Sequence, residues 1–165
     1  MKLDTGRTTR ATPMSSMPSS RENDLATIRS ATVADAVRIA ELSGILGYPI
    51  TAKTAAARLE YLLSRSEHLV VVAEITGVVG WVHASEQYGL ESGLECAIIG
   101  LAAEADQRAR GIGRGLVGRV ERWAAERGLE QLSVRSNITR SESHPFYERL
   151  GYVRMKTQHV YRKPI

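Results

Sequence analysis

The stretch DQRARGIGRG, residues 106–115, places three glycines and three arginines within ten positions. It lies between an apolar run, LECAIIGLAAE, and a run of helical periodicity, LVGRVERWAAERG. Glycine weakens a helix by about 1 kcal/mol per residue relative to alanine, so glycines clustered in the first turns of a helix require a reason. The cluster indicates that the backbone approaches another group closely.

Two nucleotide-binding motifs fail on context. The dinucleotide fingerprint G-x-G-x-x-G is matched formally by Gly113, Gly115 and Gly118. It requires glycines directly after a strand and an acidic residue at the end of the next strand. Here the preceding strand ends near Ala103 and the next one ends in VRSN. The triphosphate loop requires Gly-Lys-Ser/Thr, which does not occur in the chain.

A helix N-terminus that binds an anion explains the stretch better. The first N–H groups of a helix are unpaired, and the aligned peptide dipoles add partial positive charge there. Gly111 and Gly113 would leave those N–H groups accessible to a phosphate, while Arg108, Arg110 and Arg114 add formal charge. The alternative is a helix start whose glycines serve close packing and whose arginines face water. We favour the anion site.

Two motifs in order resemble a known family. The pattern R-x-x-G-x-G at residues 108–113 resembles the acyl-CoA-binding motif of the GNAT superfamily of N-acetyltransferases. SHPFYERLGY, residues 143–152, resembles the second signature of that family, and a helix and a strand separate the two. The resemblance covers about residues 25–163. It implies an α/β (α+β) fold with a mixed, mainly antiparallel sheet, helices on both faces, and central strands splayed at a cofactor slot.

The resemblance also implies an activity. It predicts an acetyl-CoA-dependent N-acetyltransferase that transfers the acetyl group directly to a primary amine of a small molecule or peptide. A non-catalytic module that binds acyl-CoA or another anion on the same fold is the alternative. In the family, the strand before the glycine stretch pairs with the pantetheine arm, and the pyrophosphate lies on the loop backbone. The cofactor-binding residues implied here are Leu101, Ala102, Ala103, Arg108, Ala109, Arg110, Gly111, Ile112, Gly113, Arg114, Asn137, Arg140 and Tyr147.

The resemblance assigns catalytic roles to few residues. The Leu101 N–H would stabilise the carbonyl oxygen as it becomes negative, and Tyr147 would protonate the leaving sulfur. Glu95 could act as a general base through a water, and Glu74 and Glu86 are alternatives to it. The resemblance also allows a reaction without a dedicated carboxylate base. Many members have an asparagine seven residues before the tyrosine, where this chain has Arg140. Asn137 lies three residues further upstream, so either side chain could line the slot. Glutamates 86, 91 and 95 could attract a cationic amine.

Composition bounds the class of protein. The chain of 165 residues suits one domain, with 43% hydrophobic and 24% charged residues. A net charge of +4 without a basic block argues against nucleic-acid binding, and no apolar run is long enough for a membrane helix. Cys96 is the only cysteine, which fits a reducing cytoplasm. We expect no metal site, and the resemblance alone suggests a homodimer.

Periodicity and turn residues predict the elements. Residues 1–24 should form a flexible tail, and residues 25–165 a single acetyltransferase domain. A hairpin should turn at Thr76-Gly77, and the apolar strand that follows should be buried on both faces. Pro49 should close the first helix, and Gly128 should end the helix after the glycine stretch. The expected strands are 25–31, 68–75, 78–88, 93–105, 130–137 and one or two within 151–163; the expected helices are 32–48, 51–65, 112–127 and 143–151.

Overall fold

The computed structural model describes residues 25–165, without the side chains of Asp106, Arg108 and Ala109. The predicted flexible tail, 1–24, lies outside the described residues. The elements in chain order are β1 (Thr27–Ser30), the 3-10 turn η2 (Val33–Asp35), α1 (Ala36–Ile45), α2 (Ala52–Leu63), β2 (His68–Glu74), β3 (Val78–Gly89), β4 (Gly93–Ala103), η3 (Ala105–Arg110), α3 (Ile112–Glu126), β5 (Leu132–Val134) and α4 (Ser143–Arg149).

The described strands form one sheet in the order β1-β2-β3-β4-β5. Neighbours from β1 to β4 are antiparallel, and β5 runs parallel to β4. The β2–β3 hairpin turns where Thr76-Gly77 predicts it. Parallel neighbours need a crossover connection, and α3 supplies it between β4 and β5. The fold is therefore a mixed, mainly antiparallel α/β sheet, as the sequence predicts.

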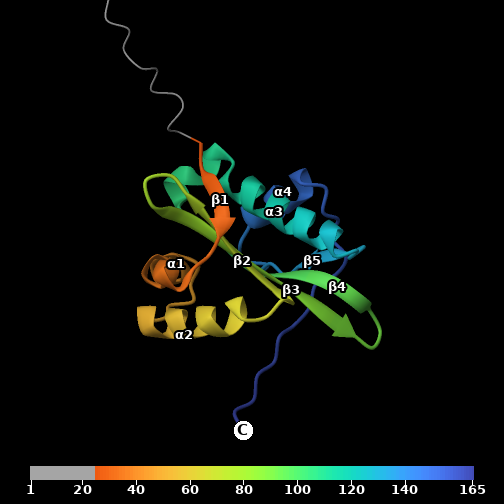
Figure 1. Cartoon of the computed structure of the whole chain (residues 1–165). Coiled ribbons are helices and arrows are strands. Elements are labelled where there is room, and N and C mark those ends of the chain that lie inside the picture. The colour runs from red at the N-terminus through yellow and green to blue at the C-terminus, as the bar shows by residue number, and fades with distance from the viewer. Residues whose placement is uncertain (1–24) are drawn as a thin grey trace, which may run out of the picture.

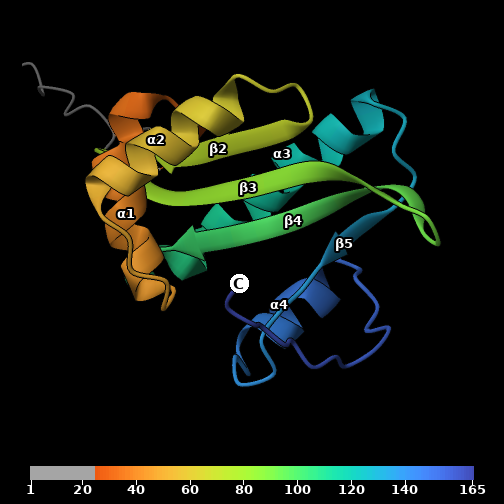
Figure 2. The ribbon, with the colours of Figure 1, turned by 90° about the horizontal axis from the view of Figure 1, so that it is seen from below.

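Helices cover both faces of the sheet (Figures 1 and 2). On one face, α1 and α2 pack on the sheet, and Leu42 of α1 and Leu59 of α2 share a buried cluster with Val72 of β2. On the other face, α3 packs through Leu116 and Val120, and α4 adds partly buried side chains to the same core. The helical periodicity of this part of the sequence corresponds to a buried face of α3, which includes Ile112, Leu116, Val120 and Trp123.

Helix ends follow glycine more than proline. Gly128 ends α3 with a φ of +69°, as expected. The first helix, however, ends at Ile45 rather than at Pro49. Gly47 follows with a φ of +85° and donates its N–H to the Gly44 carbonyl at 2.9 Å. A left-handed glycine just past a helix satisfies its last carbonyl groups, so Pro49 lies beyond a helix that has already ended.

Two predictions about strands are wrong. Residues 151–163 contain no strand, because β5 has only three residues and pairs only with β4 among the described strands. So short a strand gives a closing strand little edge to pair with. Strand β4 is also not buried on both faces, since Ile99 is 51% exposed. Among residues 25–165, no helix is long and apolar enough to cross a membrane.

Candidate active site

Strand β4 has a bulge and then a free edge. Its register with β3 pairs Gly100 with His83 but Ile98 with Ala84, so Ile99 is an extra residue. The pairing of β4 with β5 stops at Ile98. A bulge bends its strand and ends regular pairing. Residues 99–103 therefore have no strand partner on the β5 side within the described chain, and β5 diverges from β4 beyond the paired residues (Figure 2).

Gly100 is required at the bulge by a neighbouring ring. A Cβ built on Gly100 would lie 2.7 Å from Cη2 of Trp81 and 2.9 Å from Cζ3. Real Cβ atoms do not approach a ring so closely, so any larger residue would displace the indole or the strand. Trp81 lies on the α1/α2 face and packs against that core. The glycine thus allows a large aromatic ring to lie directly over the bulge.

The glycine-rich stretch forms the junction between η3 and α3. Gly111 has a φ of +75°, the left-handed conformation that glycine adopts most readily. A Cβ added there would meet nothing within 4 Å, so the backbone borders open space. The first i→i−4 bond runs from the Gly115 N–H to the Gly111 carbonyl at 2.9 Å. The amides of Ile112, Gly113 and Arg114 precede it and are the donors of the helix end.

Gly113 serves close packing between two helices. The sequence alone left open whether this glycine serves packing or leaves room for a ligand. A Cβ on Gly113 would lie 3.1 Å from Cζ of Phe146, so this glycine lets α4 approach the first turn of α3. Arg110 ends η3 and Arg114 lies in the first turn of α3, both with exposed side chains. The side chains of Arg108 and Ala109 lie outside the described residues. Of the predicted anion site, the structure describes the backbone at Gly111 and the exposed side chains of Arg110 and Arg114.

Tyr147 lies on α4 within a cluster of aromatic rings. Its ring centroid is 5.0 Å from that of Phe146 and 5.6 Å from that of Tyr152, both edge-on. Burial raises the pKa of the Tyr147 phenol to about 12, and the charge of Arg140 opposes that rise. The phenol is therefore fully protonated at neutral pH. It can donate a hydrogen bond or a proton but cannot act as a base.

The connection between β5 and α4 reaches across to the end of α1. Arg140 donates from Nη2 to the Leu46 carbonyl, and its guanidinium lies 5.8 Å from the centroid of the Tyr48 ring. The Asn137 carboxamide oxygen accepts from the backbone N–H and the hydroxyl of Thr139, each at 3.0 Å. Both side chains predicted to line the slot thus make contacts within the protein in this structure.

The carboxylates considered as general bases lie apart from the bulge. Glu74 pairs with Nε of Arg29 at 2.6 Å, and Glu86 pairs with Arg127 at the end of α3. Glu95 pairs in register with Gln87. It precedes Leu101 by six residues, which is roughly 20 Å along a strand. The structure brings none of these three carboxylates to the free edge of β4.

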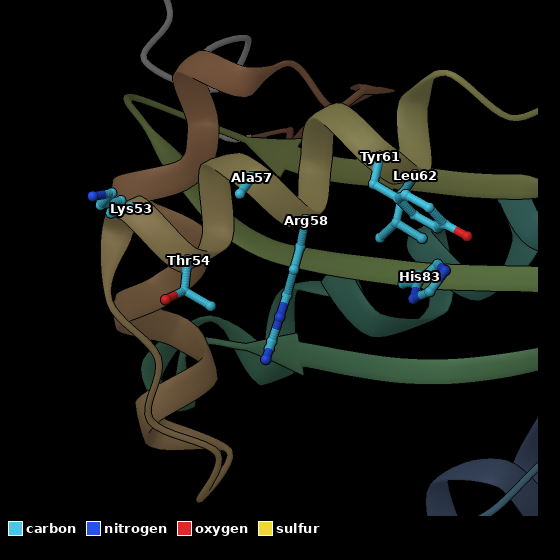
Figure 3. A pocket seen from close by; sticks show the side chains of 7 residues that line it. All are labelled: Lys53, Thr54, Ala57, Arg58, Tyr61, Leu62 and His83. Carbon is cyan, nitrogen blue, oxygen red and sulfur yellow. The ribbon is translucent and has the colours of Figure 1, made fainter.

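A pocket of about 650 Å³ lies between α2 and β3. Its size suits a small molecule. Figure 3 shows Arg58 extending from α2 across the sheet toward β4, with His83 on β3 below the end of the helix. His83 is the residue that pairs with Gly100 at the bulge, so the pocket lies beside the bulge of β4. The lining residues are Lys53, Thr54, Ala57, Arg58, Tyr61, Leu62 and His83.

Sequence reasoning missed His83, although a histidine within a β-branched apolar run was a visible signal. Its Nε2 lies 3.2 Å from Nδ1 of His68 on β2, within hydrogen-bond distance. Burial, and secondarily the proximity of His68, lowers the pKa of His83 to about 4. His83 is therefore neutral at pH 7. In the tautomer whose Nε2–H donates to His68, its Nδ1 keeps a free lone pair.

With this geometry in view, the comparisons with known proteins identify the class of protein. The model of the acetyltransferase (GNAT) family matches residues 37–152, and the chain belongs to that family. The free edge of β4 and the glycine-rich start of α3 both lie within the matched part. No curated protein matches the sequence.

Solved structures show the same fold. Aminoglycoside 6'-N-acetyltransferase AAC(6')-Ih from Acinetobacter baumannii superposes with a TM-score of 0.74 at 19% identity, over 85% of this chain and 99% of that one. AAC(6')-Iy, in complex with a CoA bisubstrate analogue, gives 0.74 at 20% identity over 85% and 99%. Glucosamine-6-phosphate N-acetyltransferase from Arabidopsis thaliana gives 0.72 at 18% identity over 83% and 97%. At these identities the likeness concerns the fold alone.

Proposed function

We propose that the chain is an acetyl-CoA-dependent N-acetyltransferase acting on a primary amine of a small molecule or peptide. One observation carries the proposal. The chain belongs to the acetyltransferase (GNAT) family. In it, the pairing of β4 with β5 stops at Ile98, and β4 is followed by η3 and then by the start of α3 at Gly111. An extended thioester ligand with a pyrophosphate needs a free strand edge and an anion site in this order.

The residues at the slot fit such a donor. The backbone of Leu101, Ala102 and Ala103 would pair with the amide groups of the pantetheine arm. The amides at the start of α3, together with Gly111, would receive the pyrophosphate, because a helix N-terminus favours negative charge. The open space beside Gly111 supports this assignment, since a Cβ there would meet no protein atom.

Acetyl-CoA supplies an acetyl group activated as a thioester, and the protein has to stabilise charge on both sides of the transfer. The Leu101 N–H lies just past the bulge and would donate to the carbonyl oxygen as negative charge develops. As the C–S bond breaks, Tyr147 would give its phenolic proton to the departing sulfur, and the proton lost by the attacking amine would restore the phenol. A phenol of pKa about 12 is a weak acid, so the nearby positive charge of Arg140 would aid the transfer.

No dedicated carboxylate base enters the proposal. Glu95 was the first candidate, and its distance along β4 argues against a direct role. An amine that reaches the slot in its neutral form needs no such base. Below the pKa of the acceptor amine, the rate should then rise about tenfold per pH unit, because the neutral fraction rises in that proportion. A cytoplasmic location and a homodimer are further predictions.

Two experiments test the proposal. Calorimetric titration with acetyl-CoA should give one site per chain, and thiol release should be steady with at least one amine of a chemically diverse panel. Binding without transfer to any amine, together with no effect of Tyr147→Phe, would favour the non-catalytic acyl-CoA module. Absence of acetyl-CoA binding would exclude both functions.

A further inference from the structure

The pocket between α2 and β3 has an uneven distribution of charge. Two of its lining side chains, Lys53 and Arg58, are cationic, and no lining residue is an aspartate or glutamate. Within residues 25–165, neither cation takes part in an ion pair or a side-chain hydrogen bond. Other arginines of this face do pair: Arg29 with Asp35 and Arg38 with Glu41. The pocket therefore has an uncompensated positive side.

The opposite side of the pocket carries a neutral histidine. His83 lies on the sheet beneath α2 and directly across from Gly100 of the bulge (Figure 3). Its bond to His68 orients the ring. The low pKa of His83, which burial causes, keeps the ring uncharged at neutral pH. A neutral imidazole nitrogen can accept a hydrogen bond from an amine or ammonium group.

We propose that this pocket binds the acceptor, and that the acceptor is a primary amine carrying a carboxylate or phosphate group held by Arg58. His83 positions the amine beside the bulge by accepting a hydrogen bond from it. This inference rests on the proposed function and narrows its substrate class. It differs from the expectation that Glu86, Glu91 and Glu95 attract a cationic amine, because here an anionic group of the acceptor provides the attraction.

The charges determine how the acceptor is oriented. Arg58 extends from α2 toward β4 (Figure 3), and a guanidinium binds planar carboxylate or phosphate oxygens in a bidentate manner. An ammonium group beside Lys53 and Arg58 would be repelled, whereas His83 offers it a lone pair. The anion is thus held on the helix side and the amine on the sheet side, next to the edge where the donor is proposed to lie.

Matched acceptor pairs test the proposal. Glucosamine-6-phosphate is compared with glucosamine, a free amino acid with its amide, and spermidine serves as the polycation. We expect the anionic member of at least one pair to have a kcat/KM at least about tenfold higher than its neutral partner, with spermidine poorest. The glucosamine pair responding alone identifies phosphate as the anion, and the amino acid pair responding alone identifies carboxylate.

Variants assign the effect to residues. Arg58→Gln should remove most of the preference, because it should raise KM for the anionic member much more than KM for the neutral member. Arg122→Gln, at an exposed arginine of α3 on the other face of the sheet, is the matched control and should change nothing. His83→Leu should raise KM for both members, and His83→Gln, which keeps an acceptor atom, should recover part of that loss. Equal losses for both members in Arg58→Gln would overturn the assignment.

A second readout separates this inference from the proposed function. Calorimetry of each amine against the protein saturated with coenzyme A measures acceptor binding without turnover. Tighter binding of the anionic member with no acetyl transfer would retain the pocket assignment and overturn the transferase. Transfer to cationic or neutral amines in preference to anionic ones would retain the transferase and overturn the inference. Equal binding of both members would also overturn the inference.

Discussion

The two sides of the proposed site differ in the parts from which they are built. The described donor side consists mainly of backbone, the free edge of β4 after Ile98 and the start of α3 at Gly111, with Tyr147 of α4 as its main side chain. The acceptor side consists of side chains on α2 and β3 that lie far apart in the sequence, such as Arg58 and His83. Backbone geometry serves one ligand shared across a family, whereas side chains can change with the acceptor. The donor side should therefore be sensitive to glycine substitutions and the acceptor side to charge.

The largest effect is expected from Gly111→Glu on the donor side. The substitution puts a side chain at a φ of +75° and a negative charge where a pyrophosphate is proposed to lie. We expect affinity for acetyl-CoA to fall at least about 100-fold, or about 2.7 kcal/mol, by calorimetry.

Gly128→Glu is the control for Gly111→Glu. Gly128 also ends a helix region with a positive φ, +69°, and also borders open space. The two variants share the backbone strain, but only one of them lies at the slot. Gly128→Glu should lower the melting temperature and leave acetyl-CoA affinity intact. Equal losses of affinity would mean that strain, rather than position, explains the result at Gly111.

Tyr147→Phe should separate chemistry from binding on the same side. It removes the phenolic proton and keeps the ring that packs against Phe146. We expect kcat to fall about 100-fold, at the lower end of general acid catalysis, with acetyl-CoA affinity unchanged. Tyr152→Phe is the control: its hydroxyl lies 3.4 Å from Glu121, and its loss should change kcat little. A Tyr147→Phe enzyme of normal kcat would remove Tyr147 from the mechanism.

Asp35→Asn tests what holds the acceptor side in place. Asp35 is buried, accepts from both terminal nitrogens of Arg29 at 2.8 and 2.9 Å, and accepts the Thr32 N–H at 2.8 Å. These bonds tie β1 to the start of α1. The substitution weakens the two charge-assisted bonds from Arg29, which keeps its pair with Glu74, so we expect a loss of about 2 kcal/mol in the free energy of unfolding. Chemical denaturation measures it, and acetyl-CoA affinity of the folded fraction should persist.

The same pair gives a pH dependence. Hydrogen bonds from Arg29 lower the pKa of the Asp35 carboxyl below its ordinary value. Its contribution is present above the ordinary pKa of an aspartate and is lost as the pH falls through the lowered folded value. Asp35→Asn should reduce the loss of stability in that acid range.

The smallest effect concerns His83. Its pKa of about 4 lies below the ordinary 6.5, so between those values the unfolded chain binds a proton that the folded chain does not. Stability should therefore fall as the pH is lowered from 6.5 to 4. His83→Gln should make this loss of unfolding free energy between pH 6.5 and 4 smaller by about 1 kcal/mol. The expected effect is less than the full pKa shift implies, because the ring is only partly buried. An unchanged slope would show that His83 is not held neutral by the fold.

The contrast between the two sides explains what could be predicted from the sequence. Glycines report backbone geometry directly, so the helix start at Gly111, the β2–β3 turn at Gly77 and the helix end at Gly128 were all correctly located. The pocket could not be predicted in this way. Arg58 and His83 lie 25 residues apart and meet only because α2 folds over the sheet. Single glutamates in strands do not indicate backbone geometry in this way. Two of the candidate bases, Glu74 and Glu86, form ion pairs with Arg29 and Arg127.

The C-terminal part shows a second limit of local pattern. Residues 151–163 contain valine and tyrosine at spacings typical of strands, yet they form none. Val153 and Tyr161 are 79% and 88% exposed. Strand propensity is realised only where a partner edge and a packing surface exist, and β5 has only three residues. Partner availability is a property of the whole fold, so it could not be predicted from this segment.

Calorimetric titration of the protein with acetyl-CoA tests the central claim most directly. The account predicts saturable binding at one site per chain, retained in Gly128→Glu and lost in Gly111→Glu. Absence of binding to the unsubstituted protein, or binding that Gly111→Glu leaves unchanged, would contradict a donor site formed by the free edge of β4 and the start of α3.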